Sequence, residues 1–217
     1  MADIFHEVDE EVRRERLAKI WERYSVLIIA GCVLIVAAVG GWRGSEWYVA
    51  RQAAIAGSQF ETAVTLAEAN KSAEAQAAFG KVAAEAPGGY ATLARFRAAA
   101  ELSKTKKDDA VKAYDALASD GSLGALWQDL ASIRAGLLLV DTAPLAEMQK
   151  RLEPLADSGR VYRHSARDLL ALSAWRVKDA AAAKKYLGMI SGDAETPPGI
   201  RSRADVLAAL MAGNGKS

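Results

Sequence analysis

Side chains that could perform chemistry are few in this sequence and lie far apart. The two histidines, His6 and His164, lack partners at the spacing of a metal site, and Arg163 and Arg167 place His164 in a basic context that disfavours a bound cation. We therefore expect structural histidines. The one cysteine, Cys32, lies in an apolar run where lipid would keep its thiol protonated and unreactive.

Other catalytic and binding motifs are also missing. No serine stands in a nucleophile-elbow context, and the glycine pairs at 40–41 and 88–89 do not form a phosphate-binding loop. The formal charge of +1 argues against general nucleic-acid binding, which needs a basic surplus. We predict no enzyme activity, no metal and no cofactor.

The chain is instead organised around an uncharged run, residues 24–42, bounded by Arg23 and Arg43. At about 1.5 Å per residue, a helix of this length crosses a hydrocarbon core of about 30 Å. A cleaved signal peptide is the alternative, with Ala38-Val39-Gly40 as a cleavage site. That triplet lies inside the run, and the preceding segment is long and mixed in charge, so we predict a retained transmembrane helix.

Basic residues near the run predict its orientation, because Lys and Arg mark the cytoplasmic side. Before it come Arg13, Arg14, Arg16, Lys19 and Arg23, and after it only Arg43 and Arg51 within a comparable distance. This bias predicts a cytoplasmic N-terminus and a C-terminal domain outside the cytoplasm, which in a bacterial cell is the periplasm.

Small residues four apart form a seam within and just after the run. Ala37 pairs with Gly41, and Gly40 with Gly44. Small residues at this spacing let another transmembrane helix approach closely, so the seam is a candidate packing surface. Alternatively, glycines at these positions only loosen the end of the helix.

Composition predicts helix throughout, because the 51% hydrophobic content is mostly alanine and leucine and aromatic residues make up only 7%. We predict an all-α protein, with a single N-terminal transmembrane helix followed by a solenoid of helical hairpins. The predicted segments are a cytoplasmic amphipathic segment at 1–23, a transmembrane helix at 24–42, a juxtamembrane helix and first solenoid helix at 43–70, repeats with a capping helix at 71–212, and a disordered tail at 213–217. The solenoid helices are expected at 51–70, 72–85, 90–104, 107–118, 123–140, 144–156, 161–177, 180–190 and 199–212.

A repeat of about 36 residues supports the hairpins. A small residue followed four positions later by an aromatic one occurs at Ala75 and Phe79, and again at Ala110 and Tyr114 and at Ala182 and Tyr186. The spacing predicts a further copy at Ala146, with Lys150 in the aromatic position. This pattern resembles tetratricopeptide repeats, each a helix-turn-helix of about 34 residues.

A stack of such hairpins has a concave surface lined by the first helix of each pair. The small positions of these helices are predicted at Ala63, Ala98, Ala135 and Ala171, and residues three earlier tend to face the groove. The candidate groove residues are Phe60, Arg95, Ser132 and Asp168, with Trp175 further along the same surface. For Phe60 and Trp175, burial in the core is the alternative.

The whole chain resembles the YfgM-like ancillary subunits of the Sec translocon. The resemblance rests on the acidic-then-basic start DIFHEVDEEVRR at 3–14, the single span, the Gly41-Trp42-Arg43 exit with Trp47, and the repeats. It implies a non-enzymatic inner-membrane protein with a periplasmic domain. Its partners would be the SecYEG translocon and a membrane-anchored periplasmic chaperone of the prolyl-isomerase type. A membrane-anchored scaffold for envelope assembly, in cell division or cytochrome maturation, is the alternative.

Overall fold

The protein is all-α, as predicted. The structure is a computed structural model that describes residues 3–214, and within that range every regular element is a helix. The chain divides into two compact units, Met1–Ile55 and Ala56–Ser217. The segment bounds predicted from the sequence stay predictions.

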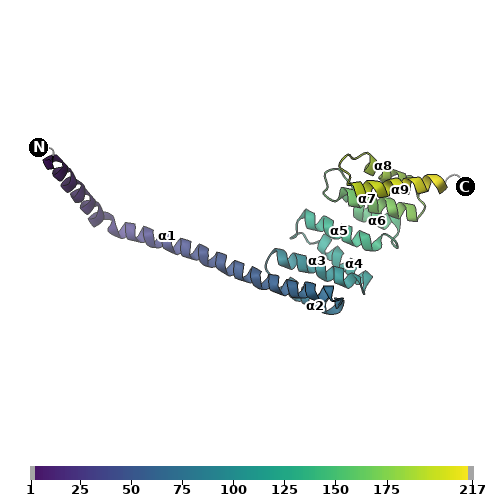
Figure 1. Cartoon of the computed structure of the whole chain (residues 1–217), viewed down its shortest axis with the longest axis horizontal. Coiled ribbons are helices and arrows are strands. Elements are labelled where there is room, and N and C mark those ends of the chain that lie inside the picture. The colour runs from purple at the N-terminus through teal and green to yellow at the C-terminus, as the bar shows by residue number, and fades with distance from the viewer. Residues whose placement is uncertain (1–2, 215–217) are drawn as a thin grey trace. The chain divides into compact units, whose positions relative to one another are not determined.

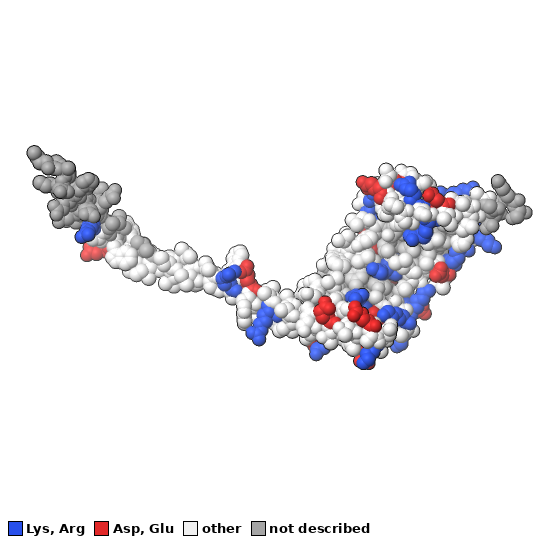
Figure 2. Space-filling model, in the orientation of Figure 1, with Lys and Arg blue, Asp and Glu red and all other residues white. Residues whose placement is uncertain are grey.

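The first unit consists of the N-terminal part of α1, which runs over Asp3–Glu68. Its middle is white in Figure 2, because no Lys, Arg, Asp or Glu occurs between Arg23 and Arg43. Apolar side chains here point outward, and Val26 is 78% exposed. An apolar helix without protein around it is not a core helix. By length and composition this is a candidate membrane span. Most side chains of the predicted amphipathic segment 1–23 lie outside the described set.

The second unit is a stack of short helices (Figure 1). After α1 the helices are α2 (Ser72–Glu85), α3 (Gly89–Ser103), α4 (Lys107–Ala118), α5 (Ala125–Leu139), α6 (Leu145–Leu152), the 3₁₀ turn η1 (Glu153–Leu155), α7 (Arg163–Arg176), α8 (Ala180–Ser191) and α9 (Pro198–Asn214). Each lies within a few residues of a predicted helix. The α-helical part of the predicted 144–156 helix ends early because Pro154 has no N–H for a helical hydrogen bond. Of the predicted tail, residues 215–217 lie outside the described residues.

Buried alanines give the repeat its period. Ala63, Ala99, Ala135 and Ala171 are buried in the first helices of successive hairpins, 36 residues apart. A residue without a bulky side chain lets neighbouring helices approach closely, which explains alanine there. The predicted small position Ala98 was therefore one residue too early, since Ala98 is only half-buried.

The turns inside the first and last hairpins repeat the same backbone conformation. Asn70, between α1 and α2, has φ 59°, and Lys178, between α7 and α8, has φ 61°. The two residues are 108 positions apart, which is three periods of 36. Each lies two residues after the last residue of its helix, where a left-handed residue is a common way to end a helix, and asparagine tolerates this conformation better than lysine.

The third hairpin differs from its prediction. Ala146 and Lys150 are exposed, so the predicted third copy of the alanine–aromatic pair is wrong. The buried pair of α6 is Met148 and Leu152, also four residues apart. Leu152 takes the place of the aromatic side chain and packs onto Gly136 of α5, where an added Cβ would lie 3.1 Å from Leu152 Cδ1.

Candidate interaction surfaces

The predicted seam of the span faces outward. Ala37, Gly40, Gly41 and Gly44 are exposed, and a Cβ added at any of the three glycines would meet no atom within 4 Å. Within the first unit, no described residue covers this small-residue strip. Its use as a packing surface stays a prediction.

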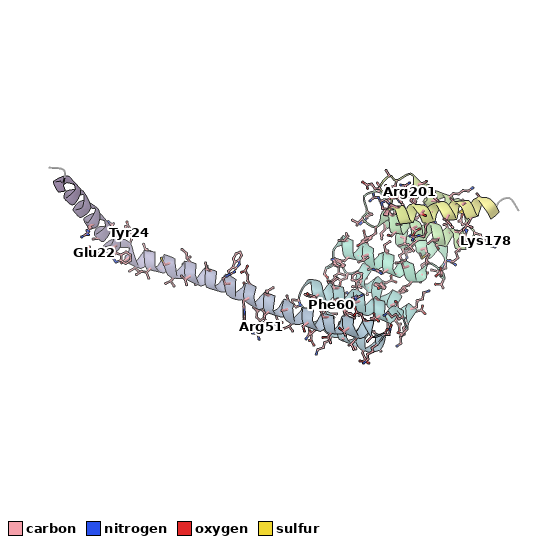
Figure 3. All side chains as sticks on the ribbon, in the orientation of Figure 1. Glu22, Tyr24, Arg51, Phe60, Lys178 and Arg201 are labelled. Atoms are coloured by element: carbon pink, nitrogen blue, oxygen red, sulfur yellow. The ribbon has the colours of Figure 1, made fainter. Side chains whose placement is uncertain are left out.

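Aromatic and basic side chains mark both ends of the uncharged run. At its start the Arg23 guanidinium lies 5.9 Å from the centre of the Tyr24 ring, and beyond its end Arg51 lies 5.3 Å from that of Trp47. Figure 3 labels Tyr24 and Arg51 on α1. Amphipathic rings and long cations are the side chains that suit the two bilayer interfaces.

Phe60, the first predicted groove residue, packs inside the first hairpin. Its ring centre lies 5.2 Å from that of Phe79 on α2 and 5.9 Å from that of Tyr90 on α3. A second cluster of three rings follows one period later. Phe96, 36 residues after Phe60, lies 6.1 Å from Tyr114 and 5.5 Å from Trp127. Both clusters join the first helix of a hairpin, its second helix and the first helix of the next hairpin.

Arg95, the second predicted groove residue, lines a hollow on α3. The hollow has a volume of about 330 Å³ and lies between α2, α3 and α4, with Gly80, Ala99 and Leu102 among its walls. The Arg95 guanidinium donates to Asp120 at 2.7 Å. Hydrogen bonds from Ser122 and then Arg95 lower the pKa of Asp120 to about 2, so this carboxylate stays charged and holds the arginine at neutral pH.

The remaining predicted groove residues have separate surroundings. Ser132 donates to the Gln128 carbonyl at 3.1 Å, within its own helix. Asp168 is buried, and Arg203 of α9 donates to it at 2.6 Å. Trp175 is 40% exposed near the end of α7.

Among the described residues, no hydrogen bond, ion pair or ring contact joins any two of the five predicted groove residues. Phe60 and Asp168 are engaged inside the fold, whereas Arg95 and Trp175 reach its surface. The groove as a single binding surface stays a prediction.

A polar network that sequence reasoning missed holds the loop before α9 onto α7. Asp193 accepts from Arg163 at 3.0 Å and from Arg167 at 2.7 Å, and these hydrogen bonds lower its pKa. Arg167 is buried and also donates to the Ala156 carbonyl at 2.8 Å. Arg163 and Arg167 are four apart on one helix face, which was the only sequence signal of a shared acidic partner.

His164 belongs to this network and has a structural role. The Thr196 hydroxyl donates to the Ile190 carbonyl at 2.8 Å, so the His164 Nδ1–H must be the donor in its 3.3 Å contact with Thr196. Burial, followed by the charge of Arg163, lowers the pKa of His164, and the ring is neutral at pH 7. In the described part of the chain no three metal-ligating side chains come together.

The fold and these surfaces define a helical-repeat protein, a class that works by presenting extended surfaces to other proteins. A family model described as a tetratricopeptide repeat-like domain matches residues 19–169, from within the N-terminal part of α1 into α7. The chain belongs to this family. No curated protein and no solved structure matches the chain.

Proposed function

We propose that this protein is a non-enzymatic subunit of the bacterial inner membrane that assists the Sec translocon and links it to periplasmic chaperones. The observation that carries the proposal is the coupling of an exposed, uncharged helical run to a tetratricopeptide repeat-like domain, both within the matched residues 19–169. An anchor positions the repeats at a membrane, and the repeats bind proteins.

Charge asymmetry supports the proposed topology. Five basic residues precede the run and only two follow it within a comparable distance, so the N-terminus lies in the cytoplasm and the repeats lie in the periplasm. An alkaline phosphatase fusion after Ser217 is expected to be active. Activity of a cytoplasmic reporter at the same position, with an inactive phosphatase, would contradict this orientation.

The span offers a means of recognition inside the bilayer. Helices associate in lipid through close packing at small residues, and the strip of Ala37, Gly40, Gly41 and Gly44 is uncovered. A transmembrane helix of the SecYEG translocon is the proposed partner of this strip. The repeats would meanwhile contact a membrane-anchored chaperone of the prolyl-isomerase type.

Affinity purification of the full chain in mild detergent tests the function. We expect the translocon subunits and the chaperone to co-purify. Replacing Gly41 by leucine should lower translocon recovery, whereas Ile35→Leu, on the opposite side of the helix, should leave it unchanged. Recovery of cell-division or cytochrome-maturation proteins in place of the translocon would favour the envelope-scaffold alternative and overturn the proposal.

A further inference from the structure

The groove between α8 and α9 is equivalent to the hollow between α2 and α3. In that earlier hollow a further helix, α4, forms a third wall. The groove between α8 and α9, here called the terminal groove, has a volume of about 520 Å³. It is lined on α8 by Lys184, Leu187, Gly188 and other residues, and on α9 by residues that include Ala204, Asp205, Ala208 and Met211. Apart from one lysine, one serine and one aspartate, its walls are apolar.

The hollow near Arg95 is the internal counterpart of the terminal groove. On α2 it is lined by Gln76, Gly80 and Ala83. The α8 lining contains Lys184, Gly188 and Ser191, each 108 residues further along the chain, or three periods of 36. The two faces are therefore equivalent, and both carry a glycine at their centre.

The first-helix walls also correspond. The hollow uses Arg95, Ala99 and Leu102 of α3, and the terminal groove uses Ala204, Ala208 and Met211 of α9, each 109 residues later. The extra residue lies in the connection between α8 and α9. By position α9 is thus the first helix of a fifth hairpin.

The difference between the two sites is their third wall. In the earlier hollow, α4 contributes Ala113, Ala116 and Leu117. Of its buried residues Ala110, Tyr114 and Leu117, the last two pack in one cluster with Phe96 and Ala99 of α3. Within residues 3–214 no helix follows α9 to cover the equivalent side, and the terminal groove is correspondingly larger.

We propose that the terminal groove receives an amphipathic helix of a partner protein, which takes beside α8 and α9 the place that α4 has beside α2 and α3. The repeat itself specifies the chemistry of that helix. In α4 one apolar face is formed by Ala110, Tyr114 and Leu117. We expect the same spacing in the partner helix: a small residue, a larger residue four positions later and a leucine three positions after that.

Charge further defines the partner. Asp205 occupies the position that corresponds to Phe96, which faces Tyr114 of α4. Among the described residues Asp205 has no ion-pair partner within 4 Å. The partner helix therefore carries lysine or arginine where α4 carries tyrosine.

The probe is a stapled, fluorescent peptide with the α4 sequence, residues 107–118, and Tyr114 replaced by arginine. A staple between positions 108 and 112, which are exposed in α4, enforces the helix, because a peptide this short is barely helical alone. Binding to the full chain in lipid nanodiscs is followed by fluorescence anisotropy. The arginine peptide should bind about two- to fivefold more tightly than the tyrosine peptide, the range for one exposed ion pair.

Gly188→Leu places a side chain in the groove without a backbone clash, since a Cβ there meets no atom within 4 Å. It should weaken peptide binding at least tenfold. Ala146→Leu, at an exposed position of α6, is the matched control and should have no effect. Asp205→Arg should reverse the preference and favour a peptide with glutamate at position 114.

Equal binding by the wild type and the Gly188→Leu variant, or no preference over a scrambled stapled peptide, would overturn the proposal. A disulfide-linked dimer formed through Ala208→Cys in a Cys32→Ser background would also overturn it, because a second copy would then occupy the groove. The proposal does not depend on which complex the protein serves, so its failure would leave the proposed translocon function standing.

Discussion

Replacing Phe79 by alanine should destabilise the first hairpin by about 4 kcal/mol. The Phe79 side chain is fully buried, its ring lies edge-on to Phe60 at 5.2 Å, and the Arg97 guanidinium lies 5.8 Å from its centre. Loss of a buried phenylalanine costs about 3–5 kcal/mol, and a ring pair of this geometry contributes about 0.5–1.5 kcal/mol beyond its buried area. The contact with the exposed Arg97 adds little.

The loss of stability caused by Phe79→Ala should remain confined to the first hairpin and its neighbour. In a solenoid each hairpin contacts its neighbours only, so a cavity between α1, α2 and α3 has little direct effect on α7 and α8. Leu93→Ala on α3 is the control, because Leu93 is 41% exposed and surface truncations usually change stability by less than about 0.5 kcal/mol.

Hydrogen exchange with mass spectrometry on the full chain in nanodiscs measures both the size of the loss of stability and the helices in which it occurs. A loss of 4 kcal/mol accelerates exchange of the most protected α2 and α3 amides by about three orders of magnitude, since each 1.4 kcal/mol is a factor of ten. Amides of α7 and α8 should keep their rates. Equal acceleration at both ends, or a loss below about 1 kcal/mol, would refute the reasoning.

Three further predictions concern the third and fourth hairpins and α9. Tyr186→Phe removes a 2.6 Å hydrogen bond to Glu153 and should cost about 1 kcal/mol at pH 7 in thermal unfolding. Hydrogen bonds from Lys185 and Tyr186 lower the pKa of Glu153, so the cost should persist above pH 4.5 and fade as the pH falls through the lowered pKa; a cost that stays unchanged at every pH below 4.5 at which the chain is folded would contradict it. His164 has a lowered pKa, so its contribution to stability should be complete above pH 6.5 and decrease as the pH falls below 6.5. In the His164→Gln variant the melting temperature should therefore change less between pH 6.5 and 5. Arg203→Ala leaves the Asp168 carboxylate without its ion-pair partner and should cost about 1–3 kcal/mol and raise hydrogen exchange in α9, whereas Arg203→Lys should restore most of the loss.

The helices could be predicted closely because turn residues separate them. Gly88 has φ 61° and Gly124 has φ 75°, a backbone conformation in which other residues are strained, and each lies immediately before a helix. Signals of this kind are local, so they can be recognised without knowing the tertiary structure.

The register of individual positions was harder to predict, for a physical reason. Ala98 and Ala99 are neighbours in an alanine-rich helix, and composition alone does not say which of them packs against the next helix. In α6, Met148 and Leu152 fill the space that an alanine and an aromatic residue fill elsewhere, because packing depends on combined volume rather than on residue type.

The candidate surfaces depended on partners that spacing does not reveal. Asp120 lies in a turn 25 residues after Arg95, and Arg203 lies on another helix, 35 residues after Asp168. These ion pairs decide which predicted groove residues are engaged. Spacing likewise does not reveal the terminal groove, because α8 and α9 form its walls only in the folded chain.

Photocrosslinking from the span in living cells tests the central claim most directly. A photoreactive amino acid at position 41, on the uncovered small-residue strip, should crosslink to a translocon subunit identified by mass spectrometry, and the same probe at position 35 on the opposite side should crosslink much less. Crosslinks from position 41 only to cell-division or cytochrome-maturation proteins, or equal crosslinking from both positions, would contradict the account.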